Sequence, residues 1–192
     1  MSQLILASGS RFRASLLERL RLPFEQIPTG VDERVRPGEM ASALATRLAQ
    51  AKAASLAAQR PGAWILGSDQ TAACGTRILG KPGTAEKAIE QLGFMQGHEV
   101  QFFTAVCLLN KASETTLSHL DRTSVKLRAL GVGEIRRYVA TEDVLDCAGS
   151  FRCEGLGISL FEQISSKDPT ALIGLPLIET SRLLRSAGFT LP

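Results

Sequence analysis

Histidine is scarce in this chain of 192 residues, which contains only His98 and His119. Neither has a neighbour at metal-ligand spacing, so a zinc centre or a histidine-based triad would have to be assembled from very few groups. Cysteine is limited to four residues with no Cys-x-x-Cys pair, which favours reduced and mostly buried thiols. Both counts argue against a zinc site and against a disulfide-stabilised fold.

Strong charge and long apolar runs are absent as well. The formal net charge of +3 is too small for the basic surface of a nucleic-acid-binding protein, but it is compatible with a small anionic substrate. No apolar stretch approaches the ~18 residues of a membrane span, and the opening MSQLILASGSR does not resemble a signal peptide. With 44% apolar and 21% charged residues, the sequence predicts a packed, cytoplasmic protein that binds neither nucleic acid nor membrane.

Apolar periodicity predicts an α/β fold. We expect a mixed, twisted sheet flanked by helices, in two lobes around a central cleft, and a single domain over residues 1–192. An irregular loop is expected over residues 23–39. The expected strands are residues 3–7, 64–67, 100–109 and 124–129, and the expected helices are residues 13–20, 42–58, 85–95, 134–139 and 176–187.

The segment LASGSRFR, residues 6–13, predicts a strand, a turn of small residues and the start of a helix. Free backbone N–H groups at a helix N-terminus attract anions, and Arg11 and Arg13 add planar donors that suit phosphate. The alternative is a serine-capped helix with two solvated arginines.

The segment ILGSDQTA, residues 65–72, raises a question, because three polar residues follow an apolar run directly. We expect the strand to end at Gly67, which places Asp69 at its carboxyl end, where α/β proteins bind ligands. A carboxylate there can hold a metal ion or accept a proton from water. The alternative is that Asp69 caps the segment that follows.

Two further segments contain candidate groups. GTRILGK, residues 75–81, resembles a phosphate-binding Walker A loop, but Pro82 lacks the hydroxyl and the N–H that such a loop requires. Lys81 is left as a cation held in a rigid turn. In AGSFRCEGLGISLFE, residues 148–162, glycines surround Glu154 and would let the backbone approach a ligand, unless the segment is simply a tight hairpin. Together these groups suit phosphoanhydride chemistry with a divalent metal.

Six separated segments resemble the Maf family of nucleotide pyrophosphatases, in the family's order. They are LILASGSRFR at the start, VDE at 31–33, RLAQAKA at 47–53, GSDQ at 67–70, GKP at 80–82 and ALIGLPL at 171–177. The sequence is most similar to the bacterial branch that hydrolyses 7-methyl-GTP, because it has an aromatic residue at 12, Gln70 and Glu154. The sister branch that hydrolyses dTTP and UTP has Arg, Thr and Gln at those positions.

The resemblance also implies roles for individual residues. Asp69 would be the proton acceptor and a neighbour of the metal, Mg²⁺ or Mn²⁺, which Glu33 would help to hold. The phosphates would be surrounded by Ser8, Arg13, Lys52 and Lys81. The base would be selected by Phe12, Gln70 and Glu154.

Two positions depart from the family pattern. Arg11 replaces the usual proline, which either loosens the turn or adds a phosphate contact, and Phe12 replaces the tryptophan typical of the 7-methyl-GTP branch. Methylation at N7 makes guanine cationic, and a cationic ring stacks on an aromatic face. A carboxylate can accept hydrogen bonds from the N–H donors of the guanine edge. Phe12 and Glu154 are therefore a suitable pair for this base.

The function that the resemblance implies is hydrolysis of 7-methyl-GTP to 7-methyl-GMP and pyrophosphate, which would clear a modified nucleotide. A homodimer is compatible with the family. Two alternatives stay open: the same chemistry on dTTP, UTP or CTP, and a non-catalytic, nucleotide-binding regulator of cell division.

Overall fold

A seven-stranded mixed sheet organises the chain in a computed structural model that describes residues 3–192. The strands are β1 (Leu4–Ala7), β2 (Glu25–Gln26), β3 (Trp64–Cys74), β4 (Arg77–Leu79), β5 (Glu99–Asn110), β6 (Thr115–Leu127) and β7 (Phe161–Ser165). Their order is β2-β1-β3-β5-β6-β7, with β4 paired to β3. The β1–β2 and β1–β3 pairs are parallel and all other pairs are antiparallel. The mixed α/β sheet expected from the sequence is confirmed.

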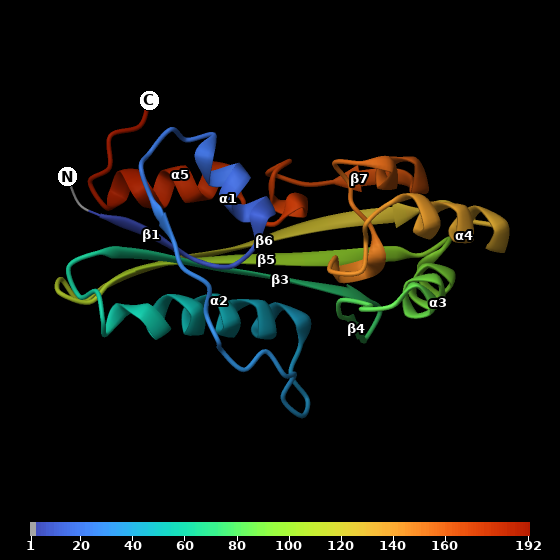
Figure 1. Cartoon of the computed structure of the whole chain (residues 1–192), viewed down its shortest axis with the longest axis horizontal. Coiled ribbons are helices and arrows are strands. Elements are labelled where there is room, and N and C mark those ends of the chain that lie inside the picture. The colour runs from blue at the N-terminus through green and yellow to red at the C-terminus, as the bar shows by residue number, and fades with distance from the viewer. Residues whose placement is uncertain (1–2) are drawn as a thin grey trace.

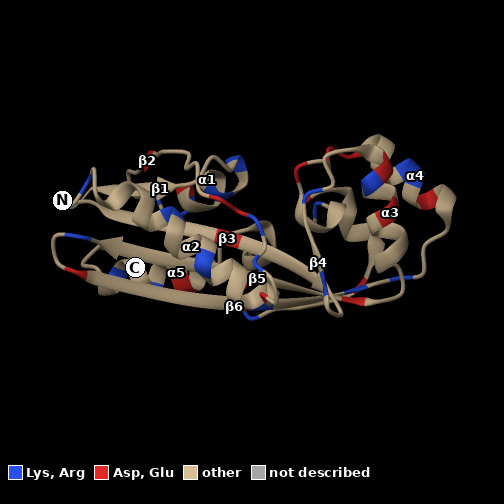
Figure 2. Ribbon diagram, turned by 90° about the horizontal axis from the view of Figure 1, so that it is seen from below, with Lys and Arg blue, Asp and Glu red and all other residues tan. Residues whose placement is uncertain are grey.

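Helices cover both faces of this sheet (Figure 1). They are α1 (Arg11–Glu18), α2 (Ala41–Ala57), α3 (Ala85–Met95), α4 (Val132–Thr141) and α5 (Leu177–Ser186), with 3₁₀ turns η1 (Ala148–Ser150), η2 (Leu156–Leu160) and η3 (Ala171–Ile173). At one end of the sheet, α2 packs on one face, and α1 and α5 lie on the opposite face. At the other end, α3 and α4 form a separate body reached by the long strands β3, β5 and β6 (Figure 2).

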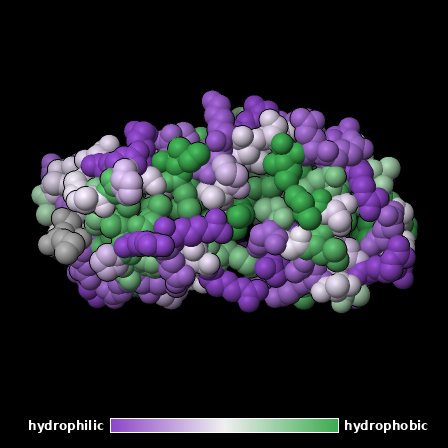
Figure 3. Space-filling model, turned by 90° about the horizontal axis from the view of Figure 1, so that it is seen from above, coloured by the Kyte–Doolittle hydropathy of each residue, from purple (hydrophilic) through white to green (hydrophobic). Residues whose placement is uncertain are grey.

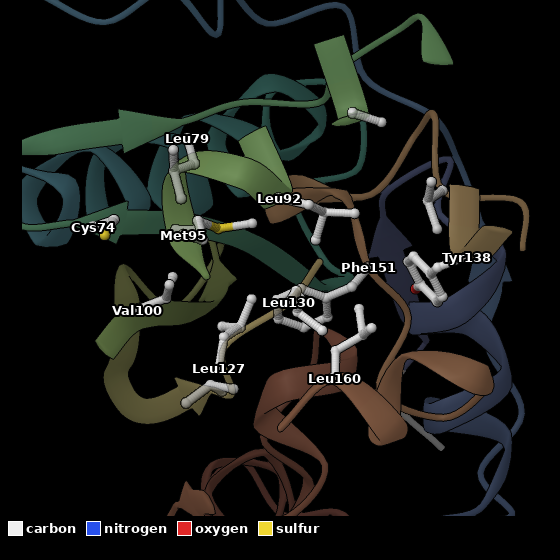
Figure 4. Packing of buried hydrophobic residues seen from close by; sticks show 14 of the residues in the cluster. Cys74, Leu79, Leu92, Met95, Val100, Leu127, Leu130, Tyr138, Phe151 and Leu160 are labelled. Carbon is white, nitrogen blue, oxygen red and sulfur yellow. The ribbon is translucent and has the colours of Figure 1, made fainter. Parts of the chain in front are cut away.

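Each end of the sheet has its own apolar packing. The α1 and α5 side buries Leu4, Leu6 and Leu66, while the α2 side is closed by small alanines. The far end is built around Phe102 and Phe151, whose ring centres are 5.3 Å apart. Figure 4 shows part of this cluster, including Phe151. The two lobes expected from the sequence are therefore separate hydrophobic cores on one continuous sheet.

The expected boundaries lie within two residues of the observed ones for the helices and are wrong for two strands. The helix predicted over residues 85–95 is confirmed as Ala85–Met95, and the one predicted over residues 42–58 as Ala41–Ala57. The strand predicted to end at Gly67 continues through Asp69 to Cys74, and the strand predicted to begin at residue 124 begins at Thr115. The short strands β2, β4 and β7 were not expected, and β2 interrupts the irregular loop expected over residues 23–39.

On the face shown in Figure 3, hydrophilic residues surround groups of apolar residues. Exposed apolar side chains include Leu156 and Ile158 of η2 and Ile164 of β7. None of the helices within residues 3–192 has both the length and the apolar character needed to cross a membrane.

Gly67 sets the distance between β3 and α2, because an added Cβ would collide with the backbone oxygen of Ala49 and lie 2.7 Å from the nitrogen of Ala53. Gly67→Ala is therefore expected to push the helix from the sheet and to lower the free energy of unfolding by about 1–3 kcal/mol. Urea denaturation measures this loss. Gly93→Ala is the matched control, since an added Cβ there meets nothing within 4 Å in the middle of α3. Equal stabilities for the two variants would contradict the argument.

Candidate functional site

A cavity of about 830 Å³ receives side chains from both ends of the sheet. It is bounded by the β1–α1 turn, α2, β3, the turn after β4, and segments near residues 143–154 and 172–174. Every site residue predicted from the sequence lines it: Ser8, Phe12, Arg13, Glu33, Lys52, Asp69, Gln70, Lys81 and Glu154. Residues dispersed over most of the chain thus meet in one place, while their individual roles stay predictions.

Asp69 and Lys52 form a buried ion pair in the cavity wall. The Nζ atom of Lys52 lies 2.7 Å from Asp69 Oδ1 and 2.6 Å from Glu33 Oε1, so one ammonium bridges two carboxylates. Lys52 and Asp69 are each 6% exposed, whereas Glu33 is open to solvent. Partial burial acts to raise the pKa of Glu33, but the hydrogen bond and charge of Lys52, with Lys81 and Arg13, lower it overall. Glu33 is therefore ionised at neutral pH.

The extended course of β3 explains the three consecutive polar residues in ILGSDQTA. Successive side chains of a strand point to opposite faces. Asp69 therefore shares the face of Gly67, which touches α2, and meets Lys52 of that helix. Ser68 and Gln70 point the other way and donate to the backbone oxygens of Gly174 and Ala171. The expectation that Asp69 lies at a strand end is wrong, because partners on both faces satisfy these polar groups inside the strand.

Arg13 joins the β1–α1 turn to the segment after η3. Its Nε donates to the Gly174 oxygen at 3.0 Å, and its Nη1 donates to Ser8 Oγ at 3.3 Å. Burial lowers the pKa of Arg13, opposed by the charges of Asp69 and Glu33. Ser10 caps α1 by accepting from the Arg13 N–H. The helix is thus serine-capped, but Arg13 is held inward rather than solvated.

Lys81 and Gln70 reach the cavity in different ways. Lys81 is exposed, between Gly80 and Pro82, and its charge acts on Glu33. The Nε2 atom of Gln70 donates to Thr104 Oγ1 and to the oxygens of Ala171 and Leu172 at 2.9–3.1 Å. These bonds commit the amide nitrogen to the protein, which leaves the Gln70 oxygen as the group available to a ligand.

Phe12 lies beside two arginines. The guanidinium carbons of Arg11 and Arg152 are 5.0 and 5.2 Å from its ring centre. Arg11 also forms an ion pair with Asp143 at 3.2 Å, and Arg152 donates through Nε to Glu154 at 3.3 Å. The side chain that replaces the family's proline therefore reaches across to the segment after α4, and its observed partners are Phe12 and Asp143.

Arg152 was not predicted as a site residue from the sequence, although it lies in the glycine-containing segment 148–162 around Glu154. Its Nη1 donates to Glu142 Oε1 at 3.0 Å, so the guanidinium joins two carboxylates as Lys52 does. The signal was the charge alternation in the stretch from Arg152 to Glu154, but the partner Phe12 is far away in the sequence. Among the described residues, no cluster of three or more His, Cys, Asp or Glu residues could hold a metal alone.

Comparison with known proteins places this cavity in a family context. The family described as Maf-like protein matches residues 3–187. The chain is 57% identical over 192 residues to the 7-methyl-GTP pyrophosphatase of Xanthomonas axonopodis pv. citri (strain 306), covering 100% of both chains. It is 49% identical over 191 residues to the 7-methyl-GTP pyrophosphatase of Aromatoleum aromaticum, covering 100% of this chain and 98% of the other.

Solved structures with low sequence identity share the fold. The Staphylococcus aureus Ham1 protein superposes with a TM-score of 0.56 at 15% identity, covering 97% of this chain and all of the other. A HAM1 protein from Coxiella burnetii gives a TM-score of 0.54 at 18% identity with the same coverage. At these identities the likeness concerns the backbone architecture alone.

Proposed function

The chain belongs to the Maf family, and from this premise we propose that it hydrolyses 7-methyl-GTP to 7-methyl-GMP and pyrophosphate. The full-length relatives with that name, at 49–57% identity, support the substrate class. We further propose that it acts in the cytoplasm, where it would clear a modified nucleotide.

The observation that carries the proposal is the separation of charge along the cavity. At one end, three cations, Arg13, Lys52 and Lys81, act on two carboxylates, Glu33 and Asp69. Around Phe12, two cations, Arg11 and Arg152, are paired with two carboxylates, Asp143 and Glu154, and Asp146 also lines the cavity. 7-Methyl-GTP has the matching distribution, because its triphosphate is anionic and its base is cationic. An unmethylated base would lack the charge that favours the Phe12 end.

In the proposed reaction, water attacks the α-phosphorus and the bond to the bridging oxygen of the β-phosphate breaks. Asp69 accepts a proton from the attacking water, and Lys52 holds its carboxylate in place. Arg13 and Lys81 neutralise the charge that develops on the leaving pyrophosphate. Ser8, which already accepts from Arg13, orients that guanidinium.

A divalent metal fits this end of the cavity by the chemistry of the donors. Lys52 contacts Glu33 and Asp69 through one oxygen each, which leaves the second oxygen of each carboxylate to bind a metal. Mg²⁺ is commonly bound by one or two carboxylates together with substrate phosphates and water. We propose that Glu33 and Asp69 hold Mg²⁺ or Mn²⁺, which would supply further neutralisation of phosphate charge.

Pyrophosphate release across 7-methyl-GTP, GTP, dTTP, UTP and CTP, with Mg²⁺ or Mn²⁺, tests the proposal. We expect the highest kcat/KM for 7-methyl-GTP, with the unmethylated GTP at least about tenfold lower because the cation–π and charge contacts are lost. A preference for pyrimidines would instead assign the sister-branch activity. Tight nucleotide binding without turnover would favour the non-catalytic regulator.

A further inference from the structure

Arg152 already makes the two contacts that the base of the proposed substrate requires. Its guanidinium carbon is 5.2 Å from the centre of the Phe12 ring, and its Nε donates to Glu154 Oε1 at 3.3 Å. A 7-methylguanine ring needs an aromatic face for its positive charge and a carboxylate for its N–H donors. The side chain and the base are both planar cations with donors along an edge, so they compete for Phe12 and Glu154.

A second carboxylate, that of Glu142, can keep the Arg152 guanidinium bound when a base enters the site. Nη1 of Arg152 donates to Glu142 Oε1 at 3.0 Å. Glu142 is itself held by the backbone, because its Oε2 accepts from the Leu156 N–H at 2.7 Å. Arg152 and Glu154 line the cavity, whereas Glu142 is not among its lining residues. A small swing about the bond to Glu142 would therefore free both Phe12 and Glu154.

Building on the proposed function, we propose that Arg152 is a resident cation that every base must displace. In the free protein, Arg152 contacts Phe12, Glu154 and Glu142. When a base binds, Arg152 stays bonded to Glu142 and the base takes its place at Phe12 and Glu154; we call this replacement the exchange. This competition weakens the binding of all bases. A cationic methylated base overcomes it by replacing the lost charge beside Glu154, whereas GTP, whose base is neutral, is held at low affinity.

Arg152→Ala tests the exchange through nucleoside binding, measured by calorimetry with 7-methylguanosine and guanosine. We expect the variant to bind 7-methylguanosine roughly three- to tenfold more tightly, with guanosine binding also improved. Steady-state kinetics should show a lower KM for 7-methyl-GTP with little change in kcat. A purely structural role for Arg152 predicts the opposite, a loss of affinity. Arg152→Gln repeats the measurement with a longer neutral side chain, should the alanine variant be poorly folded.

Two companion variants sharpen the test. Glu142→Gln removes the charge that would receive the guanidinium, so it should weaken binding of both nucleosides. Arg11→Ala removes an arginine at nearly the same distance from Phe12 but leaves the Arg152–Glu154 bond, so its gain should be smaller than that of Arg152→Ala. Equal gains in the two arginine variants would overturn the exchange at Glu154.

The outcomes for the two proposals are separable. A wild-type protein that does not prefer 7-methyl-GTP in turnover rejects the proposed function, while nucleoside binding still reports whether Arg152 competes. Unchanged or weaker nucleoside binding by both Arg152 variants overturns the exchange, even where the wild type hydrolyses 7-methyl-GTP. Nucleoside binding that is undetectable in wild type and variants alike also counts against it.

Discussion

Asp69→Asn is expected to lower the rate of pyrophosphate release by about a thousandfold or more while the fold is retained. The asparagine oxygen can still accept from Lys52, and its nitrogen can donate to Thr71 Oγ1, which now donates to Asp69 at 3.4 Å. Lys52 also keeps its contact with Glu33. The functions lost are therefore the carboxylate's ability to take a proton and the negative charge that would help to hold the metal. Single-turnover assays with 7-methyl-GTP, together with a thermal melt, measure both parts of this expectation.

Asp121→Asn is the matched control for this variant. Asp121 is another buried aspartate of the same sheet, 4% exposed on β6, but it does not line the cavity. Burial and the nearby Asp168 raise its pKa, opposed by the Thr123 hydrogen bond and by His119 and Lys167. A neutral amide is accordingly well tolerated there, and activity should be unchanged. If Asp69→Asn retained wild-type rates, Asp69 would have no place in the mechanism.

The helices were predictable because their apolar residues recur at helical spacing within a short stretch of sequence. The segment from Ala85 to Met95 repeats its apolar residues at helical spacing and is capped by Thr84, whose side chain accepts from the Lys87 N–H. The membership of the site was predictable from short segments similar to the Maf family, and each of those residues lines one cavity.

The length of β3 was not predictable from its own residues. Ser68, Asp69 and Thr71 are polar and yet at most 6% exposed, which a local pattern cannot anticipate. Their burial depends on Lys52 from α2 and on backbone oxygens near Gly174, which the fold brings in from distant parts of the chain. A strand that contains functional polar groups departs from the simple alternation of apolar and polar residues.

The environment of Phe12 could not be predicted either, because its neighbours come from distant parts of the chain. The sequence showed that Arg11 replaces a proline, but only the fold shows its ion pair with Asp143. The bond between Arg152 and Glu142 likewise depends on how α4 ends beside the turn at Leu156. The sequence thus identifies the charged residues of the loops, whereas the residues that they contact are known only from the tertiary structure.

Lys52→Met is expected to lower both stability and activity, because it removes the ammonium between Glu33 and Asp69 while keeping most of the apolar stem. The loss of one partner from a buried pair costs about 3–5 kcal/mol in a dry interior, and we expect roughly 1–3 kcal/mol here because both carboxylates face the cavity. The value of kcat/KM should fall at least about a hundredfold, since the carboxylates then repel each other and the phosphates. Urea denaturation and steady-state kinetics measure the two losses.

The pH dependence of stability and activity tests whether the losses in Lys52→Met arise from the ionisation of Glu33. In the wild type, Lys52 lowers the pKa of Glu33 against the opposing effect of burial, so this group adds stability at neutral pH that is lost as the pH falls through the lowered pKa. In Lys52→Met that pKa rises, so the acidic limb of the activity profile should move to higher pH and the stability difference from wild type should shrink in acid. An unshifted limb would mean that Glu33 is not needed in its ionised form.

The double variant Lys52→Met with Asp69→Asn separates the structural contribution of the pair from its chemistry. Replacing Asp69 by a neutral amide removes the buried carboxylate that the single variant leaves without its cation, so part of the lost stability should return. Activity should not return, because the proton acceptor and the bridging cation are then both missing. Recovery of both stability and turnover would show that Lys52 and Asp69 only support the fold, whereas recovery of stability alone assigns their buried pair to catalysis.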